Sequence, residues 1–294
     1  MEKLGRIGLT LLLVGIAAVA GTWVWDHYLY SPWTRDGRIR ADVITIAPDV
    51  SGWVTGVNVK NNQIVGKDDP LFAIDDTRYE AEVAENEARL AQERTARDLA
   101  RHKYERRQHM SDRRAISEES LETYRLRAES AKASYQLAQA QLNTARIDLE
   151  RTNVLAPESG IVNNLTLRQG NYVSRGTAVL SLIKSDSFYV TGYFEETKLQ
   201  LVRIGQKARI TLLSGGKKLT GEVTSIARGI ADPNTSSDSQ MLPQVQQAFN
   251  WVRLAQRIPV DIALDPLPEG VTISAGMTVS IYLESDSDPD PGKE

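Results

Sequence analysis

Two short segments of this chain repeat the same pattern of apolar residues, and a long stretch without glycine or proline separates them. The first segment runs from Ile46 to Ile74 and the second from Leu155 to Leu182. Apolar residues that alternate with period two indicate short, half-buried strands, so the repeat predicts two similar β pieces that pair with each other. Aligning Gly52 with Gly160 matches the apolar positions without a gap: Val54 with Val162, Val57 with Leu165, Val59 with Leu167, Val65 with Val173, Leu71 with Val179, and Ile74 with Leu182.

The stretch between the two pieces, residues 77–151, predicts a pair of helices. Asp75, Asp76 and Thr77 supply oxygen acceptors for the free backbone N–H groups of a first helix, which should end near Ser111. Ser117 is a good N-cap for a second helix, since two glutamates follow it in the first turn. A turn at 112–116 would fold the two helices antiparallel. A first helix of about 35 residues is about 50 Å long, so the tip would lie far from the β pieces.

The second helix keeps a strict heptad, which indicates a two-helix coiled coil. The first helix is less regular, because Asn86, Glu93 and Arg97 interrupt its apolar seam. In the second helix one register is Leu121, Ala128, Tyr135, Leu142 and Leu149, and the other is Tyr124, Ala131, Ala138 and Ala145; in the first helix Tyr79, Val83, Leu90, Ala100 and Tyr104 fit a single seam.

Residues 7–25 carry no charge and are long enough to span a bilayer core. Lys3 and Arg6 precede this run and Asp26 follows it, so the positive-inside rule places residues 1–6 in the cytoplasm. A cleaved signal peptide, with Ala18-Val19-Ala20 as its cleavage motif, is the alternative. Either interpretation puts the chain outside the cytoplasm from about residue 30. Aromatic residues suited to the membrane–water interface follow the apolar run: Trp23, Trp25, Tyr28, Tyr30 and Trp33.

Residues 31–45 are expected to form a linker and a first barrel strand. Residues 31–36 are rich in turn formers, and a strand is predicted over residues 38–46. From Phe188 the pattern is again β, and short turns between the strands indicate a small barrel or sandwich. The polar segment 231–250 is predicted to be a loop, and the tail 285–294 to be disordered. The expected strands cover residues 188–194, 208–213, 219–226, 258–264 and 277–283.

Composition and motifs exclude several kinds of function. A net charge of −3 gives no support for nucleic-acid binding, and the absence of cysteine excludes disulfides, thiolate metal sites and a cysteine nucleophile. His102 and His109 are seven residues apart on one helix, about 10 Å along its axis, which is too far to share a metal ion. Helix capping accounts for Asp75 and Asp76. No nucleophile–base pair, phosphate loop or zinc spacing is present, so we expect no catalytic residue, cofactor or metal.

The two β pieces, taken as residues 46–76 and 152–186, resemble the halves of a lipoyl (biotinyl-like) domain. Pro48, Gly52, Pro157 and Gly160 are its expected core and turn residues. A carrier domain of that kind presents a modifiable lysine at the hairpin between its halves, whereas the helical pair stands there in this chain. With the membrane anchor before it and a β domain at 187–284 after it, the whole resembles the HlyD-type membrane fusion proteins, the periplasmic adaptors of tripartite efflux pumps.

The resemblance implies an α+β fold with a single transmembrane helix, a split lipoyl-like domain, a long coiled-coil hairpin and a β-barrel. Within the family, several stretches are similar to the adaptors of p-hydroxybenzoic acid efflux pumps. The implied partners are an inner-membrane aromatic acid exporter, a TolC-type outer-membrane channel and further copies of the chain in a hexameric ring. These stretches are residues 31–36, 46–52, 188–190, 195–199 and 251–260, the last being the longest.

Many family members carry an Arg-x3-Leu-x6-Ser pattern at the hairpin tip, where it contacts the outer-membrane channel. Arg106, Met110 and Ser117 meet this spacing here, with methionine in place of leucine. The basic pairs 106–107 and 113–114 can also be plain solvated surface. Two other functions stay open: an adaptor for a multidrug exporter of the major facilitator type, and an envelope coiled-coil scaffold unconnected with transport. A lipoyl-type carrier is disfavoured by the missing lysine hairpin.

Overall fold

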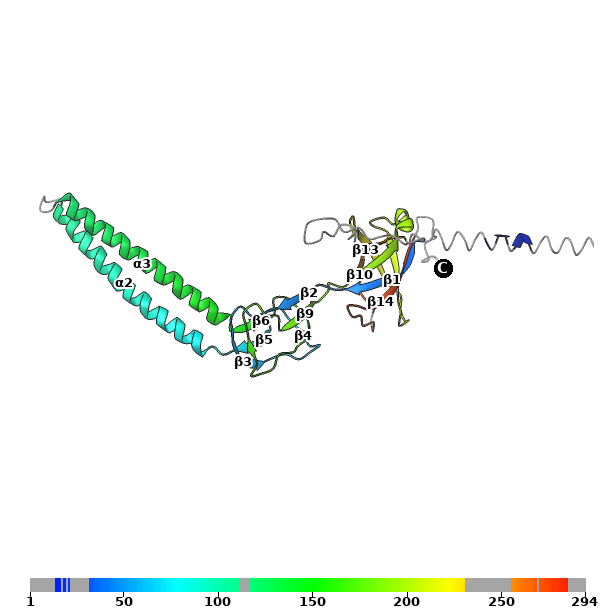
Figure 1. Cartoon of the computed structure of the whole chain (residues 1–294), viewed down its shortest axis with the longest axis horizontal. Coiled ribbons are helices and arrows are strands. Elements are labelled where there is room, and N and C mark those ends of the chain that lie inside the picture. Colours follow the sequence, from blue (N-terminus) through cyan, green and yellow to red (C-terminus); the bar gives the residue numbers. More distant parts are fainter. Residues whose placement is uncertain are drawn as a thin grey trace, which may run out of the picture. The chain divides into compact units, whose positions relative to one another are not determined.

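The computed structural model describes residues 14–16, 18–19, 21, 32–111, 117–230, 255–268 and 270–284. The chain divides into two compact units, one made of residues 1–42 and 186–294 and the other of residues 43–185. The first contains a closed β-barrel. The second contains a β-sandwich with a helical hairpin (Figure 1).

The expected membrane anchor, residues 7–25, lies almost entirely outside the described residues, and so do Trp23, Trp25 and Tyr28. In the part of the chain that the structure describes, no helix is both long enough and apolar enough to cross a membrane. The polar segment 231–250 and the tail 285–294 also lie outside the described residues.

The sandwich is built from two four-stranded sheets, ordered β2-β9-β7-β4 and β6-β5-β3-β8. Each sheet takes two strands from each β piece, which confirms that the two pieces pair with each other. Neither piece can therefore complete a sheet alone. The strands are β2 (Val43–Ile46), β3 (Gly52–Val57), β4 (Ile64–Val65) and β5 (Pro70–Ile74) from the first piece, and β6 (Asn153–Leu155), β7 (Gly160–Asn163), β8 (Tyr172–Val173) and β9 (Leu180–Lys184) from the second.

The sequence repeat is also a structural symmetry. Strands β2 to β5 correspond in order to β6 to β9, and exchanging each strand for its counterpart turns the order of one sheet into that of the other. Hydrogen bonds follow the same rule. The Val54 N–H donates to the Asn171 carbonyl at 2.8 Å, and its counterpart, the Val162 N–H, donates to the Gln63 carbonyl at 2.9 Å.

The aligned apolar positions form one core, in which most side chains are buried and Val57, Leu165 and Val179 are half-buried. Gly160 is required at its position, because an added Cβ would overlap the Ile183 carbonyl oxygen. At Gly52 the added Cβ would meet only the Cγ2 atom of Ile74, at 2.6 Å.

The two prolines among the expected core and turn residues differ in burial. Pro48 is buried, but Pro157 is exposed. Ala156, which is fully buried, occupies the place equivalent to Pro48. The two prolines are one residue out of step when Gly52 is aligned with Gly160, so Ala156 takes the core position and Pro157 lies in the exposed bend before β7.

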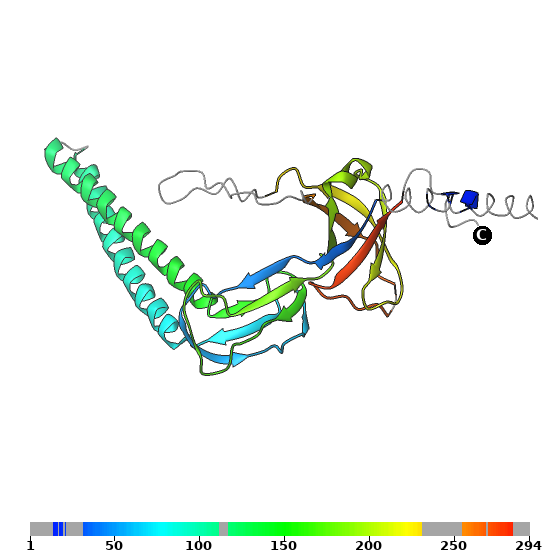
Figure 2. The same cartoon turned by 45° about the vertical axis from the view of Figure 1, so that its right-hand side comes forward.

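The hairpin helices α2 (Thr77–Ser111) and α3 (Glu118–Glu150) lie side by side, and their bounds agree with the predicted starts and ends (Figures 1 and 2). The turn at 112–116 lies outside the described residues. At the base, Tyr79 is buried in the sandwich core and its hydroxyl donates to the Ser51 carbonyl at 2.7 Å. Leu149 of α3 packs against the same core. The hairpin and the sandwich therefore share one core.

The second β domain is a closed barrel, one of the two forms expected, with strand order β1-β10-β13-β12-β11-β14. A 3₁₀ helix, η1 (Glu196–Leu201), follows β10. Phe194 and Ile262 are among the fully buried residues of its core, which is separate from the sandwich core. The strands are β1 (Trp33–Arg40), β10 (Tyr189–Glu195), β11 (Lys207–Leu212), β12 (Leu219–Ile226), β13 (Arg257–Leu264) and β14 (Thr278–Leu283).

The predicted link at residues 31–36 and single strand at 38–46 are wrong in detail. The barrel strand β1 already begins at Trp33, and the chain leaves it after Arg40 before β2 starts in the other unit. A bulge between Thr34 and Gly37 shifts the pairing of β1 with β14. Because a bulge inserts an extra residue, it breaks the period-two alternation by which a strand is recognised in sequence.

Candidate functional site

The hairpin seam on α3 follows the predicted heptad. Every residue of the two predicted registers is buried or half-buried, and Ala138, Leu142 and Ala145 are the buried ones. These three lie toward the base of the hairpin. Small and branched side chains at consecutive seam positions allow close packing of two helices, so the base half has the tighter seam.

The seam on α2 is regular, contrary to the sequence-based expectation. Asn86, Glu93 and Arg97 do not interrupt it, because they are half-buried and occupy its positions. The long side chains of Glu93 and Arg97 can cover the seam with the carbon stem while the charged end reaches water, and the Asn86 amide donates to the Glu82 carbonyl at 2.8 Å. The seam positions recur at spacings of four and three residues, and all of them are buried or half-buried: Tyr79, Val83, Asn86, Leu90, Glu93, Arg97, Ala100, Tyr104 and Arg107.

Arginine–tyrosine contacts join the two helices in the outer half of the hairpin. The guanidinium of Arg97 lies 4.2 Å from the ring centroid of Tyr135, and that of Arg107 lies 5.0 Å from the ring of Tyr124. Such cation–π contacts contribute about 0.5–1 kcal/mol at exposed sites. The outer half thus has cation–π contacts across the seam, whereas the buried apolar residues of α3 lie in the base half.

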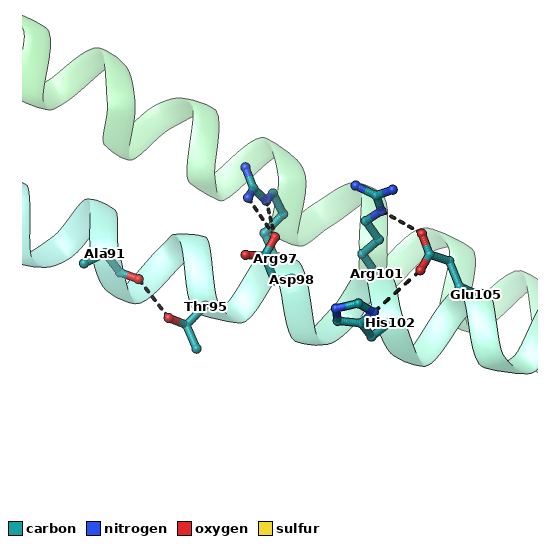
Figure 3. Close-up of polar contacts among 7 residues, drawn as sticks. All are labelled: Ala91, Thr95, Arg97, Asp98, Arg101, His102 and Glu105. Atoms are coloured by element: carbon teal, nitrogen blue, oxygen red, sulfur yellow. Dashed lines mark hydrogen bonds and ion pairs between the residues drawn. The ribbon is translucent and has the colours of Figure 1, made fainter.

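Several charged side chains of α2 form ion pairs with neighbours on the same helix (Figure 3). The Arg97 guanidinium donates to Asp98 Oδ1 at 2.7 and 3.0 Å, and this hydrogen bonding lowers the pKa of the Asp98 carboxyl. Arg101 donates to Glu105 Oε1 at 2.7 Å and lowers the pKa of that carboxyl in the same way. Exposed ion pairs add little stability, and a lowered carboxyl pKa is not that of a general acid or base at neutral pH.

Replacing Arg97 by leucine should stabilise the hairpin, because an apolar side chain at a seam position packs where a cation now needs partial hydration. We expect the melting temperature of the sandwich–hairpin unit to rise by about 2–4 °C, measured by helical circular dichroism. Arg94→Leu, an exposed position outside the seam on the same helix, is the matched control and should leave it unchanged. A lower melting temperature for Arg97→Leu would show that the contact with Tyr135 outweighs the apolar gain.

The predicted tip residues stand at the outer ends of the helices. Arg106 is exposed and Met110 is 39% exposed, and the spacing of four residues puts both on neighbouring turns of one face of α2. The Ser117 hydroxyl accepts a hydrogen bond from the Ser120 N–H at 3.3 Å, which confirms its role as the N-cap of α3. An exposed flexible methionine beside a cation is suited to packing on another protein.

A groove on the barrel was not predicted as a site. Lys198 is 9% exposed, and its Nζ atom lies 5.1 Å from the ring centroid of Trp33 and 3.7 Å from Glu195 Oε2. The Arg35 guanidinium lies 5.2 Å from the same ring. Trp33, expected at a membrane interface, therefore lines a groove of about 660 Å³ with cations beside it. The sequence gives no signal for this cluster, because Trp33 of β1 and Lys198 of η1 are far apart in the chain and meet only when the barrel folds.

In the described residues, no group of histidine, aspartate and glutamate side chains could hold a metal ion. The structure instead brings together two β domains and a helical pair. A split sandwich supports a long helical pair, and a barrel forms the other unit.

Comparison with known proteins identifies the class. Residues 42–184 match the barrel-sandwich hybrid domain of RND membrane fusion proteins, and residues 187–284 match the AAEA-like β-barrel domain. The chain belongs to the membrane fusion protein family. It is 44% identical over 274 residues to the uncharacterized protein YdhJ of Escherichia coli K12, a match that covers 93% of this chain and 96% of that one.

Two solved structures share the fold. The membrane fusion protein Spr0693 of Streptococcus pneumoniae R6 aligns with a TM-score of 0.61 at 16% identity, over 86% of this chain and 98% of that chain. A chimera of MacA with the α-hairpin domain of Pseudomonas aeruginosa MexA aligns with a TM-score of 0.58 at 22% identity, over 85% and 79%. At these identities the likeness concerns the fold alone.

Proposed function

We propose that this chain is the periplasmic adaptor of a tripartite efflux pump. Membrane fusion proteins are non-enzymatic adaptors that connect an inner-membrane transporter to an outer-membrane channel. In this chain the anchor at residues 7–25 and the barrel would engage the transporter. The hairpin would reach the channel.

The observation that carries the proposal is that both helices of the hairpin are anchored in the core of the sandwich. Tyr79 at the start of α2 and Leu149 at the end of α3 both belong to the sandwich core, so the arm is an extension of a folded domain. Helices of 35 and 33 residues project about 50 Å from that core. Such an arm adds little to the stability of the sandwich, and its use is to present the tip at a distance.

The transporter that we propose is an exporter of small aromatic carboxylic acids. Support comes from the stretches 188–190, 195–199 and 251–260, whose sequences are similar to those of p-hydroxybenzoic acid pump adaptors. All three lie in the segment that matches the AAEA-like barrel domain. The chain has no phosphate-binding loop, so the transporter would supply the energy.

The partner at the other end would be a TolC-type channel, contacted by Arg106, Met110 and Ser117. Copies of the chain would surround the transported acid as a hexameric ring, with the interface aromatics Trp23, Trp25, Tyr28 and Trp33 near the inner membrane. The exposure of Arg106 and Met110 at the end of α2 supports the tip contact.

Deletion of the gene tests the proposal. We expect the deletion strain to become hypersensitive to p-hydroxybenzoate, and a plasmid copy to restore growth. Hypersensitivity to unrelated drugs alone would contradict the aromatic acid assignment and favour the adaptor of a multidrug exporter. Unchanged sensitivity to every compound would favour an envelope scaffold.

A further inference from the structure

The groove on the barrel lies where β1 begins, where β10 ends and where η1 follows β10. Strands β1 and β10 pair with each other in the barrel wall (Figure 1). Residues of all three elements line the groove. Its volume of about 660 Å³ is within the range of about 300–1,000 Å³ that is usual for small-molecule pockets. The groove is therefore large enough for a small organic ligand.

Lys198 supplies the groove with a buried cation whose carboxylate partner is distant. Lysine is rarely buried unless it is paired, yet Lys198 is 9% exposed. Its Nζ atom lies 3.7 Å from Glu195 Oε2, which is longer than a hydrogen bond, and the Glu195 side chain is 53% exposed. The ammonium group carries three N–H donors. It can therefore donate to an anion in the groove.

Arg35 adds a second cation beside the same tryptophan. Its guanidinium lies 5.2 Å from the ring centroid of Trp33, and among the described residues it takes part in no ion pair. Arg257, the third cation of the groove, is instead paired with Asp36. A guanidinium can bind the two oxygens of a carboxylate through two parallel hydrogen bonds. Two cations of the groove are thus available for an anionic group, and one of them suits a carboxylate.

Apolar side chains lie next to these cations. Trp33 and Tyr193 line the groove and are half-buried, and Leu201 at the end of η1 is 37% exposed. The Arg40 guanidinium donates to the Tyr193 hydroxyl at 2.7 Å, which holds that ring in place. An inorganic anion would leave these apolar surfaces unused, and a neutral aromatic molecule would leave the cations unused. The combination favours a ligand that is both aromatic and anionic.

We propose that this groove binds a small aromatic carboxylic acid in its anionic form. The carboxylate would lie between Lys198 Nζ and the Arg35 guanidinium. The aromatic ring would pack on Trp33 and Leu201. A supply of such acids beside the barrel rests on the proposed function, in which the transporter releases them into the periplasm.

Titration of the purified full-length chain with p-hydroxybenzoate, followed by saturation-transfer NMR of the ligand, tests the proposal. We expect saturable binding with a Kd on the order of 1 mM, because so small a ligand makes few contacts. p-Hydroxybenzyl alcohol, which lacks the carboxylate, and 4-hydroxycyclohexanecarboxylate, which lacks the aromatic ring, should each bind at least about tenfold more weakly. Inorganic phosphate at the same concentration should not displace the acid.

Variants of the groove distinguish binding at this site from binding elsewhere. Lys198→Gln and Arg35→Gln each remove one cation and should weaken binding at least about tenfold. Leu201→Glu places a negative charge beside the ligand's carboxylate and should abolish binding. Because Leu201 is partly exposed, this variant should keep the melting temperature of the barrel, so it gives a result even if Lys198→Gln destabilises the fold. Lys207→Gln is the matched control, since Lys207 is an exposed cation of β11 outside the groove, and it should bind normally.

Unchanged affinity in Leu201→Glu would overturn the proposal. Equal affinity for either analogue would also overturn it, and so would displacement by phosphate, which would show a general anion site. Saturable binding that Leu201→Glu abolishes, in a chain whose deletion changes no sensitivity, would refute the pump adaptor while the site stands. A deletion strain hypersensitive to p-hydroxybenzoate, with no binding by the purified chain, would refute the site alone.

Discussion

Replacing Phe72 by alanine should unfold the sandwich together with the hairpin and leave the barrel folded. Phe72 is 1% exposed and pairs across the repeat with Val154 of the second β piece. Truncating a buried phenylalanine costs about 3–5 kcal/mol, a large part of the stability of a domain of this size. Helical circular dichroism should report the loss of α2 and α3 at a lower temperature, because Tyr79 and Leu149 are held in the same core.

The barrel supplies the matched control. Phe194 is fully buried in the separate barrel core, so Phe194→Ala should lower the barrel transition and leave the helical transition in place. Limited proteolysis with mass spectrometry distinguishes the two outcomes, since each variant should release fragments from only one unit. Loss of both units in either variant would contradict the two separate cores.

Placing acids at the tip should abolish export. In the double variant Arg106→Asp with Met110→Asp, the charge of one contact residue is inverted and the apolar knob of the other is removed. Loss of a central contact residue costs about 2 kcal/mol or more, roughly thirtyfold in affinity. Tolerance of p-hydroxybenzoate should therefore fall to that of the deletion strain, at unchanged protein level.

Gln108→Asp is the control, because Gln108 is exposed on the same turns of α2 but outside the predicted contact. It should keep normal tolerance. Full tolerance in the Arg106 and Met110 double variant would show that the channel is bound elsewhere. Ser117→Ala tests whether Ser117 is only a helix cap or also a channel contact. If it is only a cap, loss of the hydrogen bond from the Ser120 N–H weakens the start of α3, which helical circular dichroism detects, and export is kept.

Much of the fold could be predicted from the sequence, because short patterns of residues determine the strands and the helix ends. The repeat identified equivalent core positions in the two β pieces, such as Val54 and Val162. The capping residues located the starts of both helices. Left-handed positions also repeat, since Asn62 and its counterpart Gly170 both have positive φ, at 63° and 85°. These signals need only neighbouring residues, so a sequence contains them.

The rest depends on contacts between distant residues. The exchange of strands between the sheets joins Phe72 to Val154, and no local pattern encodes that choice. The bulge in β1 interrupts the alternation of apolar residues, so the start of this strand was predicted as a link. Arg97 was predicted to interrupt the apolar seam, because its contact with Tyr135 on the other helix cannot be seen in the sequence of one helix. The groove at Trp33 and Lys198 exists only once the barrel has closed.

Cross-linking from the hairpin tip tests the central claim, that this chain connects a transporter to an outer-membrane channel. Met110→Cys would be labelled in the periplasm with a maleimide–benzophenone reagent and irradiated in living cells. We expect one adduct between this chain and an outer-membrane channel subunit, identified by mass spectrometry and absent from Gln92→Cys in the base half. Irradiation that captures only further copies of the chain, or nothing, would contradict it.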